Sequence, residues 1–257
     1  MAVPLGPWGN ITPITEISIG GAEDDPTLTA DLLEVYFTLN GDIYGSTRAS
    51  VAAPWPMPVP IDAVNSATAS ETTCEVSPDG LELYFSSNRL GGAGGYDVYV
   101  SARQNRGQPF GNPVRLGELA SATDDVTPTT FTTGALVMYL SSVRTGTLDL
   151  FRTTRASRTA AWAMPVLVAE LQTSGTETEP TLTPGDTLMI LSGDGPGGRD
   201  LYMTTRTSPS DPWDTPVPIV ELNTAFSEED PWLSPDGRTL VFASNRGGSY
   251  DLYITTR

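Results

Sequence analysis

Carboxylates are the only abundant acid–base side chains of this chain. Its 257 residues include 31 Asp and Glu, no His, and 14 basic residues that are all Arg. This composition excludes Ser-His-Asp and Cys-His catalysis, histidine metal sites, lysine Schiff bases and the lysine of a phosphate-binding loop. Cys74 is the single cysteine, so it cannot form an internal disulfide, and we interpret it as a small buried side chain.

Twelve carboxylates occur in five acidic groups, which are the strongest candidates for chemistry. The groups are Glu23-Asp24-Asp25, Glu71 with Glu75, Asp124-Asp125, Glu177 with Glu179, and Glu228-Glu229-Asp230. Oxygen ligands without His or Cys suit Ca²⁺ or Mg²⁺ rather than zinc. Two carboxyl groups can instead serve as the acid and the nucleophile or base of a glycosidase. Either chemistry requires a fold that brings distant parts of the sequence together.

A second set of residues shows that the chain is a repeat. Five aspartates, each followed by an aliphatic and an aromatic residue, are separated by 55, 52, 51 and 51 residues: Asp42, Asp97, Asp149, Asp200 and Asp251. An arginine follows each aromatic residue by four positions, and a Trp or Phe follows each of the first four arginines by seven. We interpret the repeated aspartates and the Trp and Phe residues as structural, because they lie on separate strands away from any common axis.

Each unit of about 50 residues contains four short β-rich segments separated by turn residues, which is typical of a β-propeller blade. The fifth unit ends before its fourth segment. Near the N-terminus, Trp8 and Pro13-Ile14 repeat the spacing of Trp213 and Pro218-Ile219. We therefore expect residues 12–17 to complete the last blade. The sequence predicts an all-β fold, a five-bladed β-propeller with four-stranded antiparallel blades, as a single domain over residues 1–257.

In this fold the acidic groups precede the strands that line the axis, so they are predicted to gather at one channel mouth. Arg89, Arg144 and Arg246 lie in loops expected on the same face. Three interpretations stay open: a solvated rim paired with these arginines, a Ca²⁺ or Mg²⁺ site drawn from Asp24, Asp124 and Glu228, or a catalytic carboxylate pair. A deep, asymmetric pocket with aromatic walls would favour an enzyme, whereas a flat, repetitive rim would favour binding. The predicted ligand-binding residues are Glu23, Asp24, Asp25, Glu71, Asp124, Asp125, Glu177, Glu179, Glu228, Glu229, Asp230, Arg89 and Arg246.

Two units carry a recognisable phrase. The second unit has Ser77-Pro78-Asp79-Gly80 with Ser87-Asn88-Arg89, and the fifth has Ser234-Pro235-Asp236-Gly237 with Ser244-Asn245-Arg246. They resemble the Pro-Asp-type, WD-like propeller repeat of TolB-like proteins. The third and fourth units depart from it, with Thr132-Thr133-Gly134 and Pro184-Gly185-Asp186, and TolB-like propellers usually have six blades rather than five. The resemblance implies a bacterial, extracytoplasmic, non-enzymatic binding module with a protein or peptide partner.

Charge limits the partners further. A net charge of -17 argues against binding to nucleic acid or to an anionic membrane face, because both are polyanions. No run approaches 18 apolar residues, and Met1-Ala2-Val3-Pro4-Leu5 has neither a basic region nor an apolar core, so we expect no membrane span and no signal peptide in this sequence. We expect a monomeric, periplasmic or envelope-associated binding propeller, with a carbohydrate-active hydrolase that uses channel carboxylates as the alternative.

Overall fold

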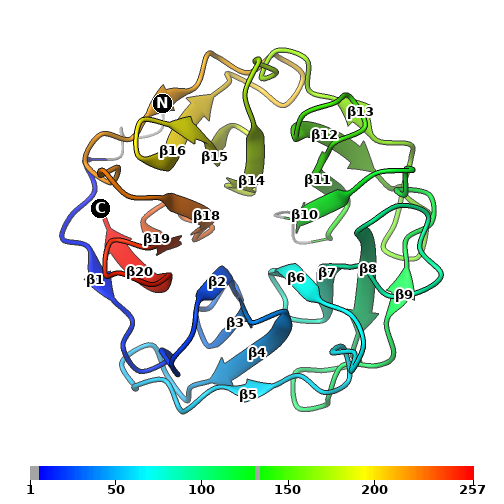
Figure 1. Cartoon of the computed structure of the whole chain (residues 1–257), viewed down its shortest axis with the longest axis horizontal. Coiled ribbons are helices and arrows are strands. Elements are labelled where there is room, and N and C mark those ends of the chain that lie inside the picture. The colour runs from blue at the N-terminus through cyan, green and yellow to red at the C-terminus, as the bar shows by residue number, and fades with distance from the viewer. Residues whose placement is uncertain (1–5, 131–133) are drawn as a thin grey trace.

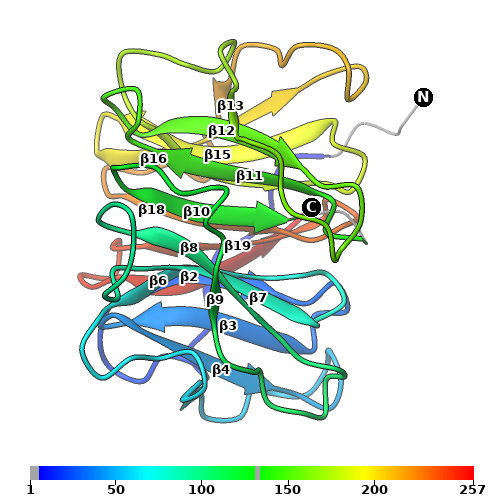
Figure 2. The same ribbon diagram turned by 90° about the vertical axis from the view of Figure 1, so that its right-hand side faces the viewer.

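The computed structural model describes residues 6–130 and 134–257 and shows five antiparallel sheets arranged as a ring (Figure 1). Each sheet has four strands, the innermost beside the central axis and the outermost at the perimeter. Viewed from the side, the strands run from one face of the ring to the other, with connecting loops at both faces (Figure 2). The predicted all-β, five-bladed propeller is confirmed, and the described residues contain no helix, hence none long and apolar enough to cross a membrane.

The blades follow one another in chain order, and in the first four blades the strands succeed one another from the axis outward. Blade one contains β2 (Glu23–Leu28), β3 (Glu34–Leu39), β4 (Asp42–Thr47) and β5 (Val59–Pro60). Blade two contains β6 (Glu71–Val76), β7 (Glu82–Ser87), β8 (Asp97–Ala102) and β9 (Val114–Arg115). Blade three contains β10 (Asp125–Thr130), β11 (Val137–Ser142), β12 (Asp149–Thr154) and β13 (Val166–Leu167). Blade four contains β14 (Glu177–Leu182), β15 (Leu188–Gly195), β16 (Gly198–Thr205) and β17 (Val217–Pro218).

Blade five joins the two ends of the chain, as the Trp spacing predicts. It contains β18 (Glu228–Leu233), β19 (Thr239–Ser244) and β20 (Asp251–Thr256), and its outer strand is β1 (Thr12–Pro13). Thr12 lies opposite Ile254, and the Ile14 amide donates to the Leu252 carbonyl at 2.8 Å. The outer strand is shorter than the predicted residues 12–17. After Ile14 the chain turns, and the Ile17 amide donates to the Ile14 carbonyl at 3.2 Å, so residues 15–17 do not continue the ladder.

The blades are held together by apolar clusters and by repeated arginine–aromatic stacks. One cluster, for example, joins Val35 and Phe37 of blade one to Trp232 and Val241 of blade five. The repeated Trp or Phe lies under the repeated arginine in every blade, with the guanidinium carbon 4.1 to 4.4 Å from the ring centroid. These aromatic residues pack as structural elements, as their regular spacing predicts.

Every inner strand has a β-bulge at its third residue, and this feature positions the site. The third residues adopt positive φ angles of 49° to 53°, in the left-handed region that non-glycine residues seldom occupy: Asp25, Thr73, Thr127, Glu179 and Asp230. The strand register shifts at the same point in all five blades. A proline follows in four blades and Cys74 in blade two. In blade three, Phe131 and Thr132-Thr133 of the predicted strand and turn lie outside the described residues.

Candidate functional site

The first residue of each inner strand is an acid that is buried inside its own blade. These acids are at most 6 % exposed: Glu23, Glu71, Asp125, Glu177 and Glu228. Glu71 is representative, because it accepts hydrogen bonds from the Ser66 amide (2.6 Å), the Ser87 hydroxyl (2.7 Å) and Arg89 Nη2 (2.9 Å). The carboxylate oxygens of such an acid are hydrogen-bonded, and these bonds stabilise the loop that precedes the inner strand.

Pairing of these acids with loop arginines, one of the three interpretations that the sequence left open, is observed in three blades. Arg89 pairs with Glu71, Arg144 with Asp125, and Arg246 with Glu228. These pairs belong to the walls of the blades, so the rim-pairing interpretation accounts for part of the predicted site.

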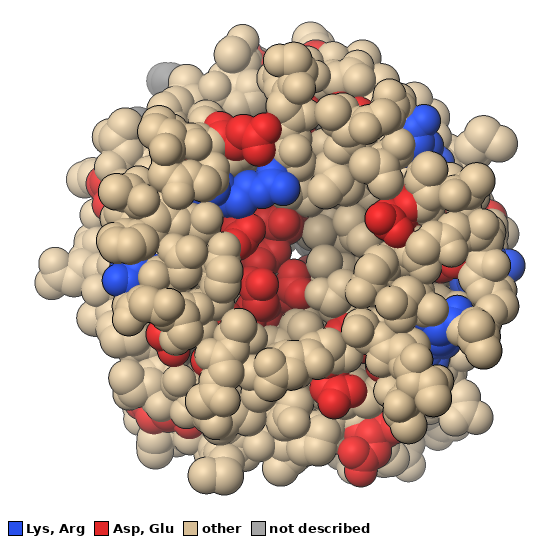
Figure 3. Space-filling view, in the orientation of Figure 1, with Lys and Arg blue, Asp and Glu red and all other residues tan. Residues whose placement is uncertain are grey.

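Five of the remaining acids come from the second and third positions of the inner strands, and they converge on the axis. Asp24, Asp25 and Asp230 present carboxylate oxygens that lie within 4.8 Å of one another, and so do Glu179, Glu229 and Asp230. We call these five residues the axial cluster. It draws on blades four, five and one, which are neighbours in the ring. Acidic atoms accordingly gather on one side of the central hollow (Figure 3).

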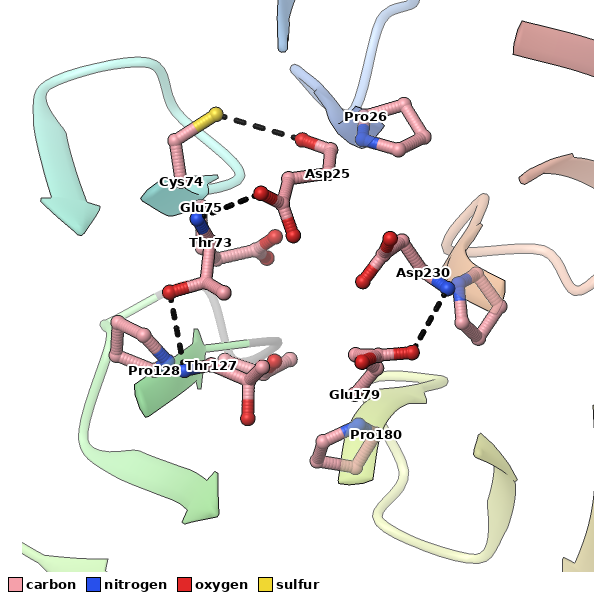
Figure 4. Close-up of a pocket in the computed structure, with 12 residues that line it drawn as sticks. Asp25, Pro26, Thr73, Cys74, Glu75, Thr127, Pro128, Glu179, Pro180 and Asp230 are labelled. Carbon is pink, nitrogen blue, oxygen red and sulfur yellow. Dashed lines mark hydrogen bonds between the residues drawn. The ribbon is translucent and has the colours of Figure 1, made fainter. Parts of the chain in front are cut away.

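On the opposite side of the channel, the bulge positions carry hydroxyl groups instead of acids. Thr73 and Thr127 occupy the bulge positions of blades two and three (Figure 4). The Thr73 hydroxyl lies 2.6 Å from the Ser86 hydroxyl of the neighbouring strand, and Thr127 bonds in the same way to Ser141. The channel is therefore chemically asymmetric although its backbone repeats in all five blades.

Within the axial cluster, few donors compensate the carboxylates. The Asp230 amide donates to Glu179 Oε2 at 3.0 Å, and the Thr73 amide and the Thr72 hydroxyl donate to Asp25 Oδ2 at 2.8 Å each. Over residues 6–130 and 134–257, no arginine forms an ion pair with any of the five carboxylates. Figure 4 shows Asp25, Glu179 and Asp230 facing one another across the cavity.

This environment raises the pKa values of four carboxyl groups of the cluster, those of Asp24, Glu179, Glu229 and Asp230. Burial, reinforced by neighbouring carboxylates, raises the pKa of Asp24 to about 7 and that of Glu179 to about 7. The pKa of Glu229 is raised mainly by burial, and that of Asp230 lies well above its usual range through burial and the charges of Asp24 and Glu179. Near neutral pH the cluster therefore shares protons that isolated carboxylates would have lost.

A sixth carboxylate, Glu75, lies beside the bulges at the fifth position of β6. It accepts a hydrogen bond from the Thr27 hydroxyl at 2.8 Å, and burial raises its pKa to about 8. Cys74 next to it is buried, and burial raises the pKa of its thiol well above the usual value, which agrees with its interpretation as a small filler.

The channel is narrow at the level of the bulges. The third and fourth residues of the inner strands line a cavity of about 30 Å³, which is close to the volume that one water occupies in the liquid. A second cavity of about 20 Å³ lies further along the inner strands, among apolar residues that include Leu28 and Trp232. A water or a cation fits the waist, whereas a sugar ring does not. Among the described residues, no aromatic side chain lines the cavity at the bulges.

Of the predicted metal ligands, only Asp24 belongs to the axial cluster. Asp124 accepts a hydrogen bond from the Tyr96 amide at 2.8 Å on blade three, and Glu228 is occupied by Arg246, Thr224 and Ser244. The five acidic groups by themselves do not mark the bulge position. A signal in the sequence is the inner-strand Pro, or Cys74 in blade two, because the residue that precedes it occupies the bulge.

Comparisons with known proteins agree on the architecture. No protein-family model and no curated protein sequence matches the chain. The putative TolB from Agrobacterium tumefaciens matches with a TM-score of 0.58 and 15% identity, over 91% of this chain and 76% of that one. The fold is that of a TolB-like β-propeller. TolB from Acinetobacter baumannii matches with a TM-score of 0.53 and 16% identity, over 92% of this chain and 55% of that one, so the chain spans about half of that protein.

The TolB-like fold is shared with enzymes. The endo-arabinase from Bacteroides thetaiotaomicron VPI-5482 matches with a TM-score of 0.70 and 13% identity, over 95% of this chain and 96% of that one. At these identities the likeness concerns the fold alone, and the chemistry has to be argued from the residues of the site.

Proposed function

We propose that this TolB-like propeller is a non-enzymatic binding module whose axial cluster binds a divalent cation and whose acidic face engages a protein or peptide partner. The observation that carries the proposal is the convergence of five carboxylates with which no arginine among the described residues forms an ion pair. Like charges in a partly buried site repel one another, and a bound cation removes this repulsion.

The donor set fits a hard cation. Ca²⁺ takes six to eight oxygen ligands from carboxylates, carbonyl groups and water, and tolerates irregular geometry. The two overlapping carboxylate groups share Asp230, so one ion near Asp230 would have ligands from blades one, four and five. Such an ion would also stabilise the ring, because it joins inner strands that are far apart in the sequence.

The cavity favours binding over hydrolysis. The carboxylates are asymmetric, as an enzyme would require, and the endo-arabinase shares the fold. However, the waist of about 30 Å³ cannot contain a glycosidic bond with a sugar on either side, and the described residues that line it include no aromatic side chain to stack against a sugar. The hydrolase therefore stays the second candidate. The TolB-like fold also supports the proposal of an extracytoplasmic location.

Calcium titration of chelator-treated protein tests the proposal directly. Isothermal titration calorimetry at pH 7 should show a saturable site, and proton release in buffers of different ionisation enthalpy should accompany binding, because the cluster is partly protonated. The double variant Asp24→Asn/Asp230→Asn should lose the site. Asp62→Asn, which removes an exposed carboxylate, should keep it and is the matched control. Equal binding by both variants, or none by the wild type, would contradict the proposal.

A further inference from the structure

In blades two, three and five, an arginine side chain lies beside the first acid of the inner strand and pairs with it. In blade two, Arg89 Nη2 donates to Glu71 Oε1 at 2.9 Å and to the Val64 carbonyl at 2.7 Å. Its Nε donates to the Ser87 hydroxyl at 3.0 Å, and its guanidinium carbon lies 4.8 Å from the centroid of the Tyr99 ring. The guanidinium is thus held by four elements: a buried carboxylate, a carbonyl, a hydroxyl and an aromatic face.

The same four elements recur around the other two arginines. Arg144 contacts Asp125, the Leu119 carbonyl (2.8 Å), Ser142 (2.9 Å) and the Phe151 ring (4.8 Å). Arg246 contacts Glu228 (3.0 Å), the Leu222 carbonyl (2.9 Å), Ser244 (3.1 Å) and the Tyr253 ring (5.1 Å). We call this arrangement the arginine socket. Its recurrence shows that it is a property of the repeat.

Blade four has the carboxylate, the carbonyl and the aromatic residue of the socket but lacks both the serine and the arginine. The strand register pairs Glu177 with Gly193, as it pairs Glu71 with Ser87, so glycine replaces the socket serine. Two residues later, Gly195 stands where Arg89 stands in blade two. The alignment is secured by Asp194, which accepts the Thr176 amide at 3.2 Å, just as Asn88 and Asn245 accept the corresponding amides in blades two and five.

The missing side chains leave a cavity of about 230 Å³ lined by the remaining elements. Glu177 is 6 % exposed, and its carboxylate accepts hydrogen bonds from the amide (3.1 Å) and the hydroxyl of Thr173. The serine and arginine that bind Glu228 in blade five have no counterpart around Glu177 within the described ranges. Leu171, at the position of Val64, and Tyr202, at the position of Tyr99, also line the cavity.

The absence of an arginine does not by itself produce a cavity, as blade one shows. There the register pairs Glu23 with Leu39, whose side chain is buried at the position of Gly193. Glu23 is satisfied by the amides of Ile19 (2.9 Å) and Gly20 (3.2 Å). Blade four instead combines a buried carboxylate with open space.

We propose that the blade-four socket binds a guanidinium group from outside the chain. The carboxylate of Glu177 supplies a charge-assisted acceptor, Leu171 supplies a carbonyl, and the face of Tyr202 suits a planar, weakly hydrated cation. An arginine side chain of a protein partner and free arginine share this chemistry. The site is distinct from the axial cluster and does not rest on its function. Asp194 at the edge of the pocket pairs with Arg199 at 3.5 Å, so the attraction of a cation to the pocket rests on Glu177 and on the net charge of -17.

The experiment uses blocked arginine (N-acetyl-arginine amide), blocked lysine and free L-arginine as probes in amide NMR titrations of the wild-type protein. Blocked arginine should cause saturable shifts at Gly175, Thr176 and Gly193, and blocked lysine should bind at least about fivefold more weakly, because it lacks the planar fork. Comparable or tighter binding of free arginine would identify the amino acid itself as ligand, whereas preference for the blocked form would identify an arginine residue of a partner.

Two variants at one position form a matched pair. An added Cβ at Gly193 lies 3.3 Å from the Thr176 carbonyl oxygen and from Tyr202 Cε2, so both variants introduce the same local crowding. Gly193→Leu fills the socket as Leu39 does in blade one and should weaken blocked-arginine binding at least tenfold. Gly193→Ser restores the socket hydroxyl and should bind as well as the wild type or better.

Glu177→Gln provides a second variant that does not depend on filling the socket. It keeps an acceptor for the Thr173 amide but removes the charge. Blocked arginine should therefore bind at least about tenfold more weakly, because a hydrogen bond to a charged acceptor is lost. Shifts that persist unchanged in Gly193→Leu and Glu177→Gln, or equal binding of blocked arginine and blocked lysine, would overturn the proposal. So would the absence of any saturable shift in the wild type.

Discussion

The axial cluster predicts an unusual pH dependence of stability. Burial gives Asp24 and Glu179 folded pKa values of about 7, and Glu75 about 8, against ordinary values of 3.8 for Asp and 4.5 for Glu. Between about pH 5 and 7 the folded state therefore binds more protons than the unfolded state. The free energy of unfolding must then rise as the pH falls through this window, opposite to the behaviour of a salt-bridged carboxylate.

The size of the effect follows from the number of excess protons. Each one changes the free energy of unfolding by about 1.4 kcal/mol per pH unit. A single excess proton in the cluster amounts to about 3 kcal/mol between pH 7 and pH 5, which corresponds to roughly 6–12 °C in melting temperature for a chain of this size. Below about pH 4 the trend should reverse, because Asp31, Asp79 and Asp236 have lowered pKa values and lose their stabilising interactions on protonation.

Calcium should act through the same carboxylates. An ion bound only by the folded ring adds RT ln(1 + [L]/Kd) to the free energy of unfolding and competes with the protons. Thermal melts followed by circular dichroism, in chelator, in NaCl and in CaCl₂ of equal ionic strength, should show an extra increment from calcium at pH 7. The increment should shrink at pH 5. In Asp24→Asn/Asp230→Asn both the calcium increment and the rise in stability on acidification should diminish, whereas Asp62→Asn should match the wild type.

Two results would refute this reasoning. If the melting temperature in chelator falls steadily from pH 7 to pH 5, the cluster does not hold excess protons in the folded state. If calcium and NaCl act alike at pH 7, the carboxylates are screened by solvent and form no cation site.

Further predictions concern ring closure, the contacts between blades, the cluster and catalysis. Deleting residues 1–19 removes the outer strand of blade five and the buried Trp8. The free energy of unfolding should fall by about 5 kcal/mol or more in thermal melts, and size-exclusion chromatography should show association through the unpaired strand edge. A monomeric protein of unchanged stability would contradict the closure of the ring. Glu82→Ala leaves Arg155 of blade three without its buried partner and should cost about 3–5 kcal/mol in denaturant unfolding, and a cost below 1 kcal/mol would show that the pair is solvated. Ala243→Ser supplies the hydroxyl that blade five lacks opposite its bulge, so it should lower the pKa of Asp230 in carboxyl NMR titrations, and a higher pKa would be evidence against that geometry. A panel of aryl glycosides and polysaccharides should show no turnover, and hydrolysis that Asp24→Asn abolishes would favour the enzyme.

The architecture was predictable because it depends on short-range periodicity. Repeated Asp-aliphatic-aromatic segments, turn residues and the Trp spacing specify strands and their number, and a ring of blades leaves few ways to arrange them. The same reasoning placed Trp8 and Pro13 at the closing strand, because a repeat missing at one end of the chain was found at the other. The placement of Arg89, Arg144 and Arg246 on the same face as the acids was also predicted from the repeat, whereas their pairing with these acids was one of three interpretations that the sequence left open.

The division of the acids between blade walls and axis was decided by the tertiary structure. Glu228 and Asp230 are two residues apart and belong to one acidic group, yet the first is buried against Arg246 and the second faces the channel. The bulge, with its positive φ at Asp230, produces this difference, and no local preference of an acidic residue predicts it.

The open socket of blade four also depends on the tertiary structure rather than on the sequence alone. Aligned repeats reveal Gly193 and Gly195 in place of serine and arginine, but not whether neighbouring side chains close the space. Blade one fills it with Leu39, whereas blade four leaves about 230 Å³ around a buried carboxylate. Composition and periodicity are properties of the chain alone. Which charged groups lose their partners depends on strand register and on the residues that the ring brings beside them.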